Sequence, residues 1–158
     1  MNTPAKKISA LIPCYNEEKS IAEVIKNFPF ARLRECGFLL EVVVIDNAST
    51  DKTSEVAASH GAKVLSEPKK GKGNAIRTGF YSIGPDTDYV VMLDGDDTYS
   101  SDEILRLVEP LDSGFATVVL GSRLAGNITK GSMKAFNKLG NWVYSHLVRY
   151  FYQVNVTD

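Results

Sequence analysis

The sequence predicts an α/β fold built around a mostly parallel central sheet. Three observations predict it: short apolar runs recur along the chain, segments with helical periodicity separate them, and polar residues follow most of the apolar runs. Strands that alternate with helices are joined by right-handed crossovers and form parallel sheets. Because parallel strands share one direction, their carboxyl ends meet at one edge, where open α/β sheets bind ligands.

Five apolar runs are expected to form the strands. Continuous runs rich in β-branched residues are typical of parallel strands that are covered on both faces. The run EVVVID shows this pattern most clearly, and the run AKVL shows it least. The expected strands are residues 8–12, 41–46, 62–65, 89–93 and 116–121.

Five segments with helical spacing follow these runs. Apolar residues at i, i+3, i+4 and i+7 form one face of a helix, as in the sequence from Ile21 to Phe28. Ser100 or Ser101 is expected to cap the fourth helix. The aromatic residues of the fifth could pack on the sheet or lie at a membrane interface. The expected helices are residues 21–28, 50–60, 75–83, 104–111 and 136–152.

Composition narrows the class of protein. The 158 residues fit a single domain over residues 1–158. A net charge of −1 argues against a nucleic-acid partner, which requires a clustered basic excess. Cys14 and Cys36 form no C-x-x-C motif, which indicates reduced thiols and a cytoplasmic location. The first residues lack the apolar core of a signal peptide, and no apolar run has the length of a membrane span.

An acidic motif, Asp94-Gly95-Asp96, follows the fourth expected strand. Two carboxylates at a strand end could bind one Mg²⁺ or Mn²⁺ ion, which takes oxygen ligands from carboxylates, phosphates and water. They could equally belong to a turn before the next helix, with Asp97 as a cap. From this motif alone both interpretations remain open.

Two interpretations are also open for the glycine-rich stretch around Gly71 and for the polar residues that follow the other strands. The stretch matches neither a dinucleotide-binding G-x-G-x-x-G motif nor a P-loop. Its lysines could form a solvated charge run or contact a diphosphate. Asp46 and Asn47 could close a turn or bind a ligand, and Arg123 could pair with a carboxylate or a phosphate. Cys14, at the end of the first strand, is interpreted as a packing residue.

Taken together, these segments resemble family 2 glycosyltransferases of the GT-A fold. The matching stretches are LIPCYNEEKSI, VVVIDNASTDKT, KKGKGNAIRTGF and VVMLDGDD, in this order. GSRLAGNITKGSM and the closing VTD resemble the subgroup of dolichyl- and polyprenyl-phosphate sugar synthases. The resemblance implies a Rossmann-like three-layer sandwich. Asp158 begins a motif that continues in the family, so we expect a catalytic domain truncated at its C-terminal end.

The resemblance implies roles on the nucleotide side of the site. Pro13, Tyr15 and Glu17 would flank the base and ribose of the donor. Asp46 and Asn47 would contact the base.

Further positions would bind the sugar-diphosphate side and the acceptor. Gly71, Lys72 and Asn74 would lie near the ribose and diphosphate, while Asp94 and Asp96 would bind the ribose and a Mg²⁺ or Mn²⁺ ion. The positions expected at the acceptor phosphate are Arg123, Lys130 and Lys134, and those expected to be catalytic are Asp94, Asp96 and Arg123.

The implied function is inverting, metal-dependent transfer of a hexose from a UDP- or GDP-sugar to a polyprenyl or dolichyl phosphate. A phosphate acceptor needs no general base, because it is already ionised at neutral pH. Such an acceptor favours peripheral association with the cytoplasmic face of the membrane. The alternatives are a polysaccharide or protein hydroxyl acceptor, a nucleotidyltransferase, and an inactive nucleotide-binding fragment.

Overall fold

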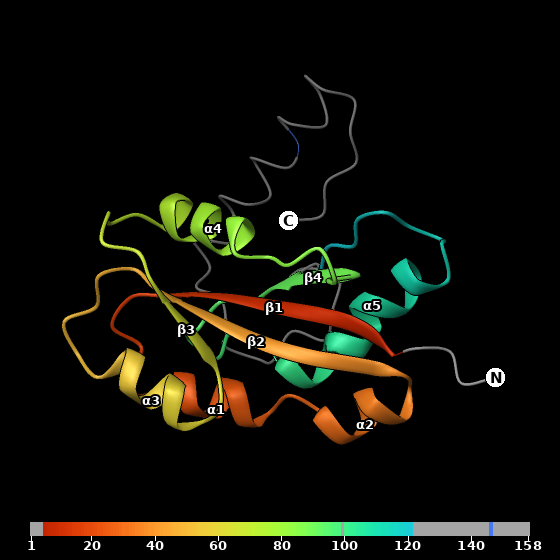
Figure 1. The fold of residues 1–158 in the computed structure, drawn as a ribbon, viewed down its shortest axis with the longest axis horizontal. Helices are drawn as coiled ribbons and strands as arrows, with labels where there is room; N and C mark the ends of the chain where they lie inside the picture. The colour runs from red at the N-terminus through yellow and green to blue at the C-terminus, as the bar shows by residue number, and fades with distance from the viewer. Residues whose placement is uncertain (1–4, 99, 122–145, 147–158) are drawn as a thin grey trace. The chain divides into compact units, whose positions relative to one another are not determined.

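A computed structural model describes residues 5–98, 100–121 and 146 of the chain (Figure 1). Contacts divide the chain into two compact units, Met1–Val118 and Val119–Asp158. The fold and the site described below belong to the first unit. A single domain over residues 1–158 stays a prediction.

The first unit contains a four-stranded parallel sheet. Its strands are β1 (Lys6–Cys14), β2 (Phe38–Asp46), β3 (Lys63–Ser66) and β4 (Tyr89–Met92). Their order is β3-β2-β1-β4, and every neighbouring pair is parallel. Cys14 pairs with Asp46, and Asp46 pairs with Ser66, so three strands end level with one another. The predicted parallel sheet is confirmed.

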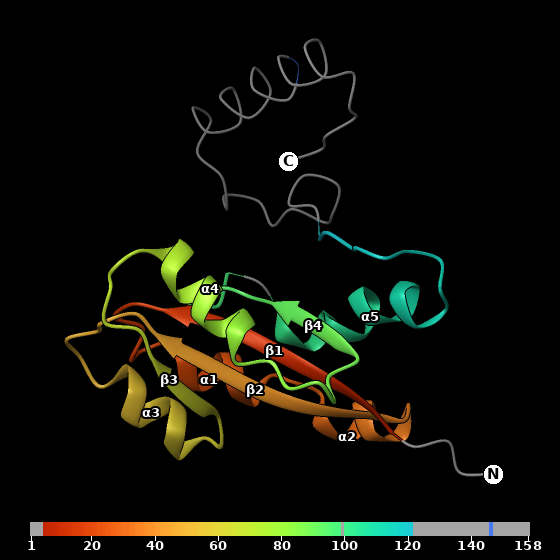
Figure 2. The ribbon, with the colours of Figure 1, turned by 45° about the horizontal axis from the view of Figure 1, so that its top comes forward.

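Helices cover both faces of this sheet and give the expected three layers (Figures 1 and 2). They are α1 (Ile21–Lys26), α2 (Phe30–Glu35), α3 (Thr53–Ser59), α4 (Lys72–Tyr81) and α5 (Ile104–Asp112), the last preceded by the 3₁₀ turn η1 (Ser101–Glu103). Among the helices that the structure describes, α4 lies alone on one face, while α1, α2, α3 and α5 pack on the other (Figure 2). In the part of the chain that the structure describes, no helix is long and apolar enough to span a bilayer.

Strand β1 lies inside the sheet, and its side chains belong to both hydrophobic cores. Ile8 and Ile12 are fully buried in the larger core, whereas Leu11 points into the smaller core beneath α4. Burying side chains of this size stabilises the fold by about 1.5–3 kcal/mol each. Gly79 lets α4 approach closely, since a Cβ at this position would lie 3.0 Å from the Cδ1 of Ile45. The start of α4 is thereby held beside the carboxyl ends of β1 and β2.

Strand β1 extends beyond its expected end and includes Pro13. The carbonyl of Leu11 accepts the N–H of Leu93, so Pro13, two residues later, faces the same side. Strand β4 has already ended at Met92, opposite Leu11, and no ladder bond is lost where Pro13 lacks its N–H. The strand expected at residues 8–12 therefore ends two residues later than predicted.

Two other expectations differ from the structure. Helix α2 was not predicted, because Leu33 is the one buried residue among its six and a single buried position shows no periodicity. The fifth strand is wrong: residues 116–121 form no strand. Val118 is 73% exposed and Leu120 is 87% exposed, and an apolar run becomes a strand only where a ladder pairs its backbone groups. The helix expected at 136–152 lies outside the described residues, apart from His146.

Candidate active site

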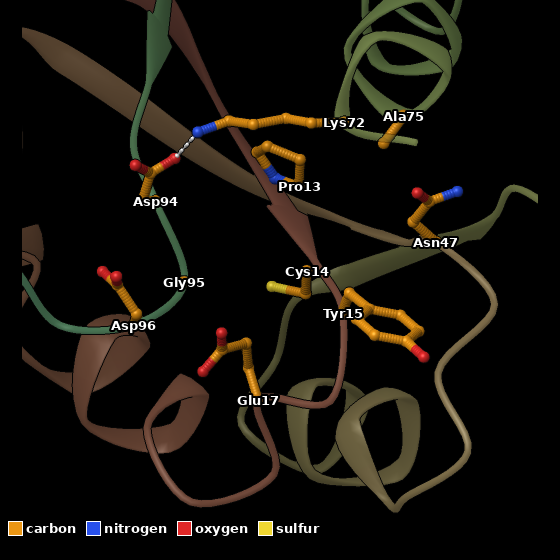
Figure 3. A pocket seen from close by; sticks show the side chains of 10 residues that line it. All are labelled: Pro13, Cys14, Tyr15, Glu17, Asn47, Lys72, Ala75, Asp94, Gly95 and Asp96. Atoms are coloured by element: carbon orange, nitrogen blue, oxygen red, sulfur yellow. Dashed lines mark hydrogen bonds and ion pairs between the residues drawn. The ribbon is translucent and has the colours of Figure 1, made fainter. Parts of the chain in front are cut away.

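A cavity of about 220 Å³ opens at the carboxyl edge of the sheet (Figure 3). The loops after β1, β2 and β4 and the first turn of α4 form its wall. The lining residues are Pro13, Cys14, Tyr15, Glu17, Asn47, Lys72, Ala75, Asp94, Gly95 and Asp96. The structure thus brings together most of the positions that sequence analysis singled out on the donor side.

An ion pair crosses this cavity. The Nζ of Lys72, the first residue of α4, lies 2.5 Å from the Oδ1 of Asp94 (Figure 3). The Lys72 side chain is 59% exposed and that of Asp94 is 28% exposed. A pair this accessible to water contributes at most about 1 kcal/mol to stability. It therefore leaves both charges available to a ligand.

Gly95 sets the position of the acidic motif. A Cβ on this buried glycine would lie 2.5 Å from the Sγ of Cys14, which is closer than packed atoms can approach. Only glycine therefore lets this turn lie against the end of β1. In this position both Asp94 and Asp96 line the cavity.

Asp96 is held by the turn that follows it. Its Oδ1 accepts the N–H of Thr98 at 3.0 Å. This bonding to Thr98 outweighs the effect of burial and keeps the pKa of the Asp96 carboxyl below its usual value. Asp97 adopts a left-handed conformation with φ of 58°. The N-cap residue of η1 is Ser100, and that of α5 is Glu103, so the capping interpretation of Asp97 is wrong. Ser100 begins this helical segment without the expected side-chain capping bond.

Cys14 lies beneath this turn as a neutral packing residue. Burial, followed by the nearby carboxylate of Glu17, raises the pKa of the Cys14 thiol to about 12. The thiolate is the nucleophilic form of cysteine, so this side chain is inert at neutral pH. The packing interpretation of Cys14 is consistent with its place in the core.

Hydrogen bonds join the loop after β1 to the loop after β2. The side-chain oxygen of Asn16 accepts the N–H of Thr50 at 2.8 Å, and the N–H of Asn16 is donated to Ser49 Oγ at 3.0 Å. The N–H of Glu17 is donated to Thr53 Oγ1 at 2.8 Å. Sequence analysis missed this network, although polar turn residues in both loops were its available signal.

Asp46 ends strand β2 and Asn47 follows it, and the two side chains face different surroundings. The two carboxylate oxygens of Asp46 accept the N–H of Ser49, at 2.9 Å, and the hydroxyl of Ser54. Burial acts to raise the pKa of Asp46, yet these bonds outweigh it and keep the pKa below its usual value. Asp46 does not line the cavity, whereas Asn47 does, with only 5% of its surface exposed.

The loop between β3 and α4 brings Lys70 against Tyr15, a residue that lines the cavity. Lys70 Nζ lies 4.8 Å from the ring centre of Tyr15 and 3.0 Å from its hydroxyl. Gly71 adopts φ of 128° at the N-cap of α4, and Asn74 donates to the carbonyl of Lys70 at 3.1 Å. Neither Gly71 nor Asn74 lines the cavity itself.

The donor atoms available here suit a hard divalent cation. Among residues 5–98 and 100–121, no group of three or more His, Cys, Asp and Glu side chains gathers as a complete metal site. Asp94 and Asp96 supply two carboxylates in one cavity. Mg²⁺ and Mn²⁺ are often held by one or two carboxylates, with phosphate and water completing the shell. The residues present fit such an ion.

The acceptor-side candidates cannot be placed. Arg123, Lys130 and Lys134 lie outside the described residues, and their roles stay predictions.

The chain matches the profile of one protein family over most of its length. Residues 9–155 match glycosyl transferase family 2. The chain therefore belongs to this family, and its fold is the GT-A fold.

Two curated relatives are similar along nearly the whole chain. Agl6 of Haloferax volcanii, a low-salt glycan biosynthesis hexosyltransferase, is 37% identical over 155 residues, which cover 98% of this chain and 37% of Agl6. An undecaprenyl-phosphate 4-deoxy-4-formamido-L-arabinose transferase of Salmonella paratyphi A is 34% identical over 145 residues, covering 86% of this chain and 43% of that enzyme. The chain spans less than half the length of either relative.

A solved enzyme shares the fold. Glucosyl-3-phosphoglycerate synthase from Mycobacterium tuberculosis, in complex with Mn²⁺ and UDP-glucose, superposes with a TM-score of 0.58 and 31% identity, covering 69% of this chain and 40% of the synthase. The same synthase with Mg²⁺ and UDP superposes with a TM-score of 0.55 and 31% identity, covering 67% and 39%. Those ligands are bound by the synthase.

Proposed function

We propose that this chain forms the donor-binding part of a glycosyltransferase that uses a UDP- or GDP-sugar and a divalent cation. One observation carries the proposal: Asp94, Asp96 and Lys72 lie in a single cavity at the carboxyl edge of the sheet. The two carboxylates can hold the metal ion of a metal-bound nucleoside diphosphate, and the exposed ammonium group of Lys72 can contact its phosphates. The related synthase, solved with Mn²⁺ and UDP-glucose, supports this choice of ligand class.

The acidic pair would hold the cation. Asp94 and Asp96 offer carboxylate oxygens from one turn, and Lys72 can leave Asp94 to reach a phosphate oxygen. A bound Mg²⁺ or Mn²⁺ ion neutralises the charge that develops on the leaving nucleoside diphosphate. Lys72, on a flexible stem at the mouth, adds a second positive charge beside the same group.

The nucleoside would lie toward the loop after β1. Tyr15 is 47% exposed and, like Pro13, lines the cavity (Figure 3). Glu17, with an oxygen that accepts the Ser20 hydroxyl at 2.7 Å, is held in place to accept a ribose hydroxyl. Asp46, Asn47, Gly71 and Asn74 form the surrounding shell of this donor side.

For the acceptor, we infer a polyprenyl phosphate. The relative named as an undecaprenyl-phosphate transferase supports this class. A phosphate attacks the anomeric carbon without a general base, because its second pKa is about 6. Attack from the face opposite the departing diphosphate inverts that carbon. Arg123, Lys130 and Lys134 are proposed to hold the acceptor phosphate, and the reaction then takes place at the cytoplasmic face of a membrane.

A hydroxyl-bearing glycan acceptor is the second candidate. It is favoured by the relative named as a low-salt glycan biosynthesis hexosyltransferase. This alternative requires a carboxylate base near the attacking hydroxyl.

The donor class is tested by calorimetric titration of the protein with UDP, GDP and their hexose conjugates, with and without Mn²⁺. The proposal predicts binding of one nucleotide that strengthens when Mn²⁺ is present. No binding of either nucleotide under both conditions would contradict it. Transfer of labelled hexose to undecaprenyl phosphate, compared with an oligosaccharide, separates the two acceptor classes.

A further inference from the structure

The side chain of Asn47 is bound to the backbone of a loop that lies far from it in sequence. Its Nδ2 donates to the carbonyl oxygens of Glu67, at 3.1 Å, and Lys69, at 2.8 Å. Its Oδ1 accepts the N–H of Gly71 at 2.6 Å. A primary amide has two N–H donors, so the donor capacity of Asn47 is fully used within the protein.

These bonds fix the loop that carries Lys70 and Lys72. Lys72 lines the cavity, and Lys70 contacts Tyr15, which lines it too. Lys70 and Lys72 lie on either side of Gly71, whose N–H is held by Asn47. Lys70 reaches Tyr15 on the β1 side, and Lys72 reaches Asp94 on the β4 side. The buried amide of Asn47 thereby determines where two positive charges stand relative to the cavity.

We propose that Asn47 is a positioning residue that places Lys70 and Lys72 against the diphosphate of the donor, and that it does not read the base. The inference rests on the proposed function for its ligand, but its structural part concerns the free protein. A carboxamide is needed at this site because it donates twice and accepts once. A carboxylate of equal size accepts only, and it would face the carbonyl oxygens of Glu67 and Lys69.

The isosteric change Asn47→Asp separates the two possible roles. A residue that only accepted a hydrogen bond from a base would tolerate the change, because a carboxylate oxygen remains an acceptor. A residue that clamps the loop would not, because both donors are lost. Asn27→Asp is the matched control: it makes the same replacement at an exposed position at the end of α1.

The first measurement is amide hydrogen exchange of the protein without nucleotide. We expect the hydrogen-bonded amides of this loop, those of Glu67, Lys69 and Gly71, to exchange about tenfold faster in Asn47→Asp, the factor that corresponds to about 1.4 kcal/mol. Strands β1 and β2 should exchange as in the unchanged protein, and Asn27→Asp should match it throughout. Unchanged exchange of these loop amides, or equal acceleration across the sheet, would overturn the proposal that Asn47 holds this loop.

The second measurement is UDP affinity in the presence of Mn²⁺. Asn47→Asp should lower UDP affinity about tenfold near pH 8 and by less near pH 5. Burial against the two carbonyl oxygens should raise the pKa of the introduced carboxyl group, and protonation then restores one donor. An unchanged affinity, or a loss independent of pH, contradicts positioning of the lysines. If the unchanged protein binds no nucleotide, the proposed function fails by itself, and hydrogen exchange still decides the clamp.

Discussion

The Nζ of Lys72 and the Oδ1 of Asp94 lie 2.5 Å apart across the candidate active site. The pair links the start of α4 to the loop after β4. A cation bound at Asp94 would compete with the ammonium group for the same carboxylate. We therefore expect Lys72 to exchange Asp94 for a phosphate oxygen when donor and cation bind together.

Replacing Lys72 by Met tests this exchange. The change keeps the aliphatic stem and removes the charge, so UDP affinity with Mn²⁺ should fall about tenfold. The free energy of unfolding should change by less than about 1 kcal/mol, because the ion pair is exposed.

Lys26→Met provides the control for that variant, since Lys26 pairs with Glu23 at 3.0 Å on the surface of α1. It should alter neither quantity. Equal UDP affinity in Lys72→Met and Lys26→Met would show that Lys72 does not contact the donor.

The close packing of Gly95 predicts a steric penalty. Gly95→Ala should lower the free energy of unfolding by about 1–3 kcal/mol, because the new methyl group meets the Sγ of Cys14. Gly73→Ala is the matched control: nothing lies within 4 Å of a Cβ there, and alanine suits the helix better. Urea unfolding of both variants measures the difference.

The penalty should be relieved by shortening the partner. In a double-mutant cycle, Cys14→Ala should make Gly95→Ala less costly than it is in the unchanged protein. Additive effects of the two changes would show that the contact with Cys14 is not the source of the penalty.

The raised pKa of Cys14 predicts selective thiol chemistry. At about pH 8, iodoacetamide should modify exposed Cys36 readily and leave buried Cys14 unmodified, because the pKa of its thiol is about 12. Mass spectrometry should find one added group in the native protein and two after denaturation. Rapid double labelling of native protein would contradict the buried environment of Cys14.

Asp46 predicts a pH dependence of stability. Its folded pKa lies below the unfolded value of about 3.9, so its contribution is complete above that value and is lost as the pH falls through the folded pKa. Ser54→Ala removes one bond to the carboxylate and should lower the free energy of unfolding by about 1 kcal/mol near pH 7. The difference from the unchanged protein should shrink near pH 3. A difference that stays constant across this range would assign the loss to packing.

The parallel sheet could be predicted because its strands are buried on both faces and alternate with amphipathic helices. Continuous runs such as that of β2 carry this information locally. The run at 116–121 is also rich in aliphatic and β-branched residues, but composition does not reveal whether a neighbouring strand pairs with it. Helix α2 was missed because a helix of six residues depends on tertiary packing, here the burial of Leu33.

The residues that line the site could largely be predicted from the sequence, but their hydrogen-bond partners could not. Residues at the ends of parallel strands must meet, which is why Tyr15, Asn47 and Asp94 share a cavity. The partners of each side chain depend on loop conformation over gaps of more than twenty residues, as between Asn47 and Gly71. No periodicity in the sequence encodes such a contact.

The central claim is that Asp94 and Asp96 bind a cation together with a nucleoside diphosphate. Calorimetric titration of UDP with and without Mn²⁺ tests it in Asp96→Asn, whose amide oxygen can still accept the N–H of Thr98. The control is Asp86→Asn, an exposed carboxylate paired with Lys7. We predict that Mn²⁺ strengthens UDP binding about tenfold or more in the unchanged protein and in the control, and that this gain disappears in Asp96→Asn. A gain that survives in Asp96→Asn would contradict the account.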